Sequence, residues 1–132
     1  MMAALRRQVE EPGEAFESPP ESAAAHLEAI AKGINDVDTL IQGLLSKVPP
    51  SKPWQRQLLV QLADADRHVE ILRLAIYLEH SDSEIREAAD QLRHTLQAAH
   101  AQIAGGRADG GTKATMQVAT HLARLVCALL AG

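Results

Sequence analysis

Histidine and acidic side chains are the residues of this 132-residue chain whose types could bind a metal ion. None of the histidines occurs in the Glu-x-x-His or His-Glu-x-x-His patterns that build metal centres on helices. Two Asp-x-x-x-His pairs, Asp64/His68 and Asp90/His94, each place both side chains on one helix face, outside the apolar seams described below. The sequence therefore predicts that these two pairs lie on the surface. It predicts no metal site and no cofactor for the six histidines, His26, His68, His80, His94, His100 and His121.

Nucleophilic and acid/base groups are few. Cys127 is the single cysteine, and it lies in the most apolar segment, 114–131, where burial raises a thiol pKa and suppresses reactivity. The chain has no Gly-x-Ser-x-Gly sequence. Three carboxylates, Glu84, Glu87 and Asp90, share one helix face. Because Arg86 and Arg93 lie near them in the sequence, this face is interpreted as a charged surface rather than an acid/base pair. We expect no catalytic residue and no enzymatic activity.

One short segment resembles a known signature. His94-Thr95-Leu96-Gln97-Ala98-Ala99 is similar to the His-Thr-Leu-Lys-Gly-Ala motif of histidine phosphotransfer domains, which are four-helix bundles of about this length. The resemblance implies that His94 accepts a phosphoryl group on an exposed imidazole. The chain departs from the motif at Gln97, where the family has a phosphate-attracting lysine, and at Ala98, where a glycine clears space for the partner. Phosphotransfer on His94 is the alternative function.

Charge and hydropathy exclude several classes of protein. The net charge of −4 comes from interspersed acids and bases, and no basic stripe offers a surface to nucleic acid. No secretory signal is evident. Segment 114–131 is interrupted by Gln117, His121 and Arg124, so we expect no membrane span. The lone cysteine favours a reducing compartment, and the prediction is a soluble, cytoplasmic protein.

Four stretches carry apolar residues at alternating spacings of three and four, the pattern of a helix with one buried face. The seams are Leu27, Ile30, Ile34, Val37, Ile41, Leu44 and Val48; Leu58, Leu62, Ala65, Val69, Leu72 and Ile76; Ile85, Ala89, Leu92, Leu96, Ala99 and Ile103; and Val118, Leu122, Leu125 and Leu129. They predict an all-α, up-and-down four-helix bundle over residues 18–132, preceded by a disordered acidic tail over residues 1–17.

Local signals place the helix boundaries. Ser18 begins a capping box, Pro49 to Pro53 separate the first two helices with Ser51 as cap, and Gly105 to Gly111 precede a helix capped by Thr112. The third boundary depends on phase, because the seams at Ile76 and Ile85 would face opposite ways on a continuous helix. Ser81 and Glu84 also have the spacing of a capping box, so we expect a turn near residues 80–83. The alternative is one long helix from Trp54 to Ala104.

The fourth helix is apolar around most of its circumference, so either the other three helices enclose it or part of it meets another subunit. Helix 54–80 also carries apolar residues outside its seam. These surfaces favour a non-enzymatic interaction or assembly module that binds a protein partner, including a second copy of itself. The residues predicted to make that contact are Leu59, Leu74, Leu78, Met116, Ala119, Ala123 and Val126.

Overall fold

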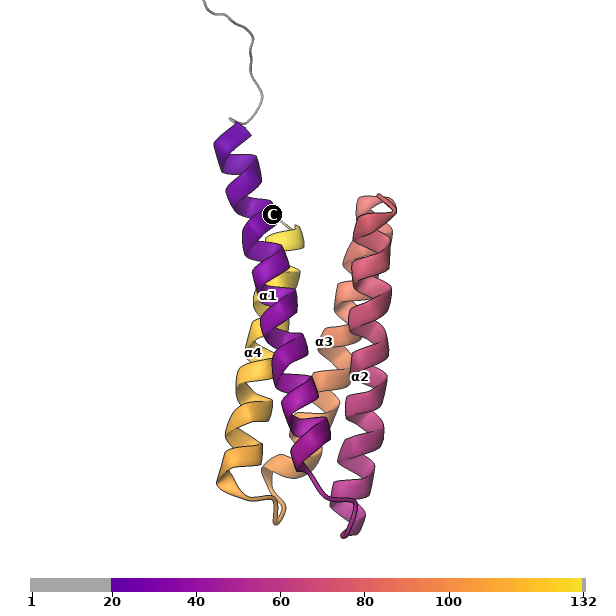
Figure 1. The fold of residues 1–132 in the computed structure, drawn as a ribbon, viewed down its shortest axis with the longest axis vertical. Coiled ribbons are helices and arrows are strands. Elements are labelled where there is room, and N and C mark those ends of the chain that lie inside the picture. The colour runs from indigo at the N-terminus through magenta and orange to yellow at the C-terminus, as the bar shows by residue number, and fades with distance from the viewer. Residues whose placement is uncertain (1–19, 132) are drawn as a thin grey trace, which may run out of the picture.

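The chain folds into four helices that pack side by side (Figure 1). The computed structural model describes the backbone of residues 20–131 and the side chains of residues 24–131. The helices are α1 (Pro20–Lys47), α2 (Pro53–Tyr77), α3 (Asp82–Ala104) and α4 (Gly110–Ala131), and no strand occurs among these residues. The all-α four-helix prediction is confirmed, whereas the predicted tail and the Ser18 cap lie outside the described residues.

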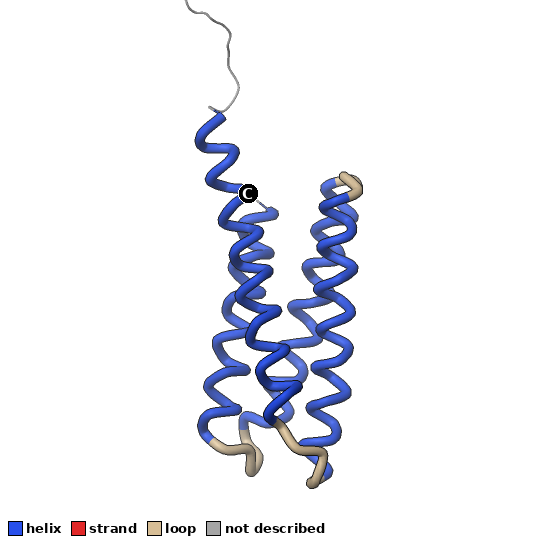
Figure 2. Tube along the Cα trace, in the orientation of Figure 1, coloured by secondary structure: helices blue, strands red, loops and turns tan. Residues whose placement is uncertain are grey.

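Helices that follow one another in sequence are neighbours in space, and α1 closes the ring against α4. The connections α1–α2 and α3–α4 lie at one end of the bundle, here called the closed end (Figure 2). The α2–α3 turn and the last turn of α4 lie at the other end, here called the open end. The pairs α1/α4 and α2/α3 run further apart toward the open end (Figure 1).

The α2–α3 turn ends α2 without glycine or proline. Glu79 adopts a left-handed backbone conformation, with φ of 55°. The amide of His80 donates to the carbonyl of Ala75, and the amide of Glu79 donates to that of Ile76. These two bonds form a Schellman motif, which satisfies carbonyls that the helix end leaves free. The predicted turn is therefore confirmed, and the single long helix is not formed.

Of the helix-capping residues predicted for α2, α3 and α4, one prediction is confirmed and two are wrong. Ser81 and Glu84 make the predicted reciprocal capping box at the start of α3. At α4 the cap is Asp109 rather than Thr112, because the Asp109 carboxylate accepts from both the amide and the hydroxyl of Thr112. Those hydrogen bonds lower the pKa of Asp109. Before α2, the side chain of Gln55 accepts from the amides of Ser51 and Lys52, so Ser51 is not the cap.

The faces of α4 differ from the prediction. Val118 and Leu125, expected in the core, are about half exposed. The buried positions are instead Met116, Ala119, Thr120, Ala123 and Val126. The prediction was wrong because α4 is apolar on both faces, and small residues let it approach α1 and α3 closely. Leu27 of the first seam is also exposed, whereas the seams of α2 and α3 are buried or nearly so.

Gly33 lies at a close approach of α1 to α4. A Cβ atom added at this glycine would lie 2.7 Å from Val126 Cγ2, closer than carbon atoms pack in proteins. A Cβ added at Gly43, in the same helix, would meet no atom within 4 Å. Gly33 therefore holds α1 close to α4, while Gly43 has no packing role.

By length and composition alone, α4 is a helix that could cross a membrane. The core helix of a bundle has the same composition, and one face of α4 is buried here by the other helices. The expected absence of a membrane span stays a prediction.

Candidate partner-binding groove

An apolar groove opens between α1 and the α2/α3 pair at the open end of the bundle. Its volume is about 510 Å³, within the range of sites that hold ligands or partner side chains. The groove is bounded by aliphatic side chains from all four helices, together with a few polar residues at its edge. The lining residues that matter below are Leu27, Ile34, Ile76, Tyr77, Ile85 and Arg86.

The groove exists because α1 packs more closely against α4 than against α2. The absence of a side chain at Gly33 lets α1 lie against Val126 of α4. On the other side, α1 packs less extensively against α2 than against α4, and polar side chains described next join α1 to α2 beside the groove. The apolar residues of α1 and α2 nearest the open end are therefore left partly uncovered, and Tyr77 and Leu27 are 82% and 63% exposed.

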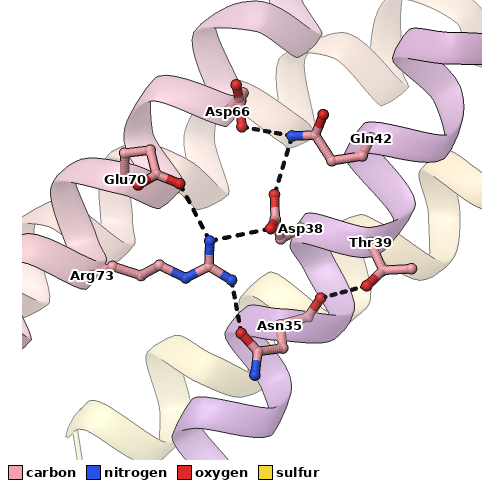
Figure 3. Close-up of polar contacts among 7 residues, drawn as sticks. All are labelled: Asn35, Asp38, Thr39, Gln42, Asp66, Glu70 and Arg73. Atoms are coloured by element: carbon pink, nitrogen blue, oxygen red, sulfur yellow. Dashed lines mark hydrogen bonds and ion pairs between the residues drawn. The ribbon is translucent and has the colours of Figure 1, made fainter.

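A set of polar side chains, here called the α1–α2 clasp, joins the two helices beside the groove (Figure 3). Arg73 donates to Asp38 at 3.1 Å and to the side-chain oxygen of Asn35 at 2.7 Å. Further toward the closed end, Gln42 donates to Asp38 at 3.2 Å and to Asp66 at 2.7 Å. Asn35 and Arg73 also line the groove. The clasp thus forms a polar boundary to an otherwise apolar surface.

Charge at the rim is balanced. Arg73 faces the carboxylates of Asp38 and Glu70 at 3.1 and 3.3 Å. Arg86 and Asp82, from the first turns of α3, complete the rim. Among the described residues Arg86 has no ion-pair partner. The rim therefore carries no strong charge of one sign, and an apolar occupant is the one that this site suits.

The structure separates the interaction residues predicted from sequence. Leu74 on α2 and Leu78, the residue that caps the C-terminus of α2, are more than half exposed, and Leu59 is half-buried against the core. Met116, Ala119, Ala123 and Val126 are at most 1% exposed, so a partner of the folded chain cannot reach them. Their binding role rested on the assumption that part of α4 faces outward, and the other helices enclose that face.

Sequence reasoning missed two features of the surface. The groove depends on how far the helix pairs diverge, which the seams alone do not encode. The outer face of α2 was only partly recognised: Val60 and Ile71 are exposed beside Leu74 and Leu78, at heptad-like spacing. A search for a second apolar periodicity within helix 53–77 would have found these two residues.

His94 lies on α3, away from the groove, with its side chain 60% exposed. Its Nδ1 is 3.4 Å from Asp90 Oδ2, and its Nε2 is 3.2 Å from Arg93 Nη2. An arginine can only donate, so Nε2 accepts and the ring proton of the neutral imidazole is on Nδ1, facing Asp90. Arg93 also donates twice to Asp90, and these bonds lower the pKa of that carboxyl. Arg93 Nη1 also donates a hydrogen bond to Gln97 Oε1 at 3.0 Å.

Cys127 is half-buried in α4, and its burial raises the pKa of its thiol despite the nearby Arg93. Within the described part of the chain, no three histidine, cysteine or acidic side chains come together as metal ligands. The predicted absence of a metal or cofactor stays a prediction.

No family model matches the chain, no curated protein matches it, and no solved structure matches it.

Proposed function

We propose that this protein is a non-enzymatic interaction module of the cytoplasm, whose open-end groove binds the apolar face of an amphipathic helix from a partner protein. The observation that carries the proposal is the groove itself, an apolar groove of about 510 Å³ between helices. Helices recognise such grooves by inserting apolar side chains spaced three and four residues apart.

The exposure of the groove residues supports this role. Tyr77 and Leu27 stand at opposite edges of the groove, on α2 and α1, and are mostly exposed. A large exposed aromatic beside aliphatic walls is typical of a residue that contributes strongly to binding. A helix lying between these two side chains would cover the inner residues Ile34, Ile76 and Ile85 and complete the bundle at its open end.

Photo-crosslinking tests the groove directly. With benzoylphenylalanine in place of Tyr77, we expect irradiation in cells to give one discrete adduct, with the crosslinked peptide of the partner in an amphipathic helix. The same amino acid in place of Gln117, which is exposed on α4 and outside the groove, should give none. Ile85→Glu should abolish the adduct and Ile85→Leu should preserve it, with circular dichroism verifying that both variants fold. Equal adducts from positions 77 and 117, or crosslinks to non-helical segments, would refute the proposal.

A second candidate function is phosphotransfer on His94, which the arrangement of Asp90 and Arg93 favours. Asp90 lies beside Nδ1 and orients the imidazole. When Arg93 turns from Nε2 to the phosphoryl oxygens, the Nε2 lone pair is released and can attack the phosphorus of an aspartyl phosphate on a receiver domain. The N–P bond forms as the P–O bond to the aspartyl group breaks, and the donor carboxylate leaves with the electron pair. Arg93 lies beside Nε2 and would serve as the cation that binds the oxygens of the incoming phosphoryl group. The carboxylate of Asp90, which would repel the phosphoryl group, is paired with that same arginine.

Incubation with a phosphorylated receiver domain distinguishes this candidate. Acid-labile phosphate should appear on the wild-type chain and vanish in His94→Gln. Arg93→Gln should slow labelling by about tenfold or more, because a donor to the transferred group is lost, and Gln97→Lys should accelerate it. A wild-type chain that takes no label, or a label that survives in His94→Gln, would eliminate phosphotransfer at this site.

A further inference from the structure

We propose that the outer face of α2 is a self-association surface, on which a second copy of this chain packs its own α2 in antiparallel orientation. This surface, here called the α2 outer stripe, consists of Val60, Asp64, Arg67, Ile71, Leu74 and Leu78. It is distinct from the groove, so the proposal stands whether or not the groove binds a partner helix.

The stripe has the spacing of a coiled-coil seam. Its positions advance by four, three, four, three and four residues, which keeps them on one side of the helix over about 27 Å. The apolar members are 46–68% exposed. The buried residues of α2, including Leu62, Val69 and Leu72, lie on its opposite side. α2 therefore presents two seams, of which the bundle covers one.

The order of residues along the stripe is self-complementary. Val60, Asp64, Arg67 and Ile71 read apolar, acidic, basic, apolar. When two such helices run antiparallel about a two-fold axis between residues 65 and 66, Val60 of one faces Ile71 of the other. Asp64 then faces Arg67 twice, once in each direction. This register places each heptad a position opposite a d position, as antiparallel coiled coils require, and a two-fold axis is the usual symmetry of a homodimer.

The same register uses the whole length of α2. The axis between residues 65 and 66 lies at the middle of the helix, which runs from Pro53 to Tyr77. Residues 53 and 78 therefore pair at the two ends, and Leu74 covers Gln57. At the flanking positions Ala63 meets Glu70 and Gln61 meets His68, so no like charges face each other at these four positions. No shift along the helix preserves both charge pairs.

Charge complementarity selects a second copy over an unrelated partner. In the isolated chain Asp64 and Arg67 pair with each other, three residues apart on the same helix. In the dimer each can exchange its partner for the equivalent residue across the interface, leaving no charge unpaired. The apolar residues at both sides supply the affinity, and the charged pair fixes direction and register.

Charge exchange tests this interface by sedimentation equilibrium of the full chain, and the wild type should show a monomer–dimer equilibrium. Asp64→Lys alone sets the new lysine against Arg67 twice, and Arg67→Glu alone sets the new glutamate against Asp64 twice. Each substitution should therefore weaken dimerisation by about tenfold or more. An equimolar mixture of the two variants should form a heterodimer at near wild-type strength. In that heterodimer the introduced lysine faces the introduced glutamate, and the native Arg67 faces the native Asp64.

The control is Arg124→Glu, a charge reversal on the exposed side of α4, which should leave the equilibrium unchanged. Val60→Ser and Ile71→Ser should weaken association without altering the circular dichroism spectrum. A wild type that stays monomeric up to millimolar concentration would overturn the proposal. So would a mixture of the two charge variants that associates no better than either alone. In this register Tyr77 flanks the interface opposite Arg56 of the second copy. An adduct from position 77 therefore supports the groove only when the crosslinked peptide is not this chain's own α2, and this criterion separates failure of the interface from failure of the groove.

Discussion

Replacing Met116 with alanine is expected to lower the free energy of unfolding by about 2–5 kcal/mol, the range observed when a large buried side chain is truncated in a packed core. Met116 is fully buried between α4 and the rest of the bundle. Its removal leaves a cavity that neighbouring residues can fill only in part. Urea unfolding followed by circular dichroism measures the change.

Leu125→Ala is the matched control on the opposite face of the same helix. Leu125 is 47% exposed, so its truncation should change the free energy of unfolding by only about 0.5 kcal/mol. If Leu125→Ala proved the more damaging substitution, α4 would face the core with the seam that the sequence first indicated. The pair therefore tests the orientation of α4 in a single experiment.

Gly33→Ala is expected to destabilise the protein even though alanine is the better helix former. The added methyl group would lie 2.7 Å from Val126 Cγ2, and Val126 is buried and cannot swing aside. Overpacking of this kind costs about 1–3 kcal/mol, against about 1 kcal/mol gained in helix propensity. We expect a lower midpoint of thermal unfolding for this variant.

Gly43→Ala is the control, because the added methyl group meets no atom there and the propensity gain of about 1 kcal/mol should appear as increased stability. Combining Gly33→Ala with Val126→Ala tests the cause, since removing the Val126 methyl groups should relieve the overlap and make Gly33→Ala neutral or favourable in that background. If Gly33→Ala and Gly43→Ala stabilised the wild type equally, the close approach of α1 to α4 would be refuted.

Sequence periodicity predicted most of the fold because three helices bury a single seam. α3 has polar residues on enough of its circumference that only one face can enter a core. In α2 the second apolar stripe is interrupted by Asp64 and Arg67, which identifies the other seam as the core face. α4 has neither feature, and its two apolar faces made the choice depend on packing: Ala119 and Ala123 are buried because small side chains allow close approach to α1 and α3. The Asp109 cap was missed for a related reason, since both Asp109 and Thr112 are good caps.

The candidate site was less accessible to sequence analysis. Leu74 and Leu78 were identified as surface residues because they fall outside the α2 seam, which is a local property. The groove arises from the unequal approach of α1 to α4 and α2, which depends on pairs such as Gly33 with Val126 and Arg73 with Asp38. Their members are separated by tens of residues, and no spacing rule within one helix connects them.

The closure of the ring by α1 and α4 has a consequence for synthesis in the cell. The α1–α2, α2–α3 and α3–α4 interfaces can each form as soon as the second helix leaves the ribosome. The α1–α4 interface joins the first of these helices to be translated with the last. At translation rates of about 5–20 residues per second, α1 waits several seconds before Val126 arrives to pack against Gly33. During that interval the nascent chain exposes the side of α1 that α4 will cover.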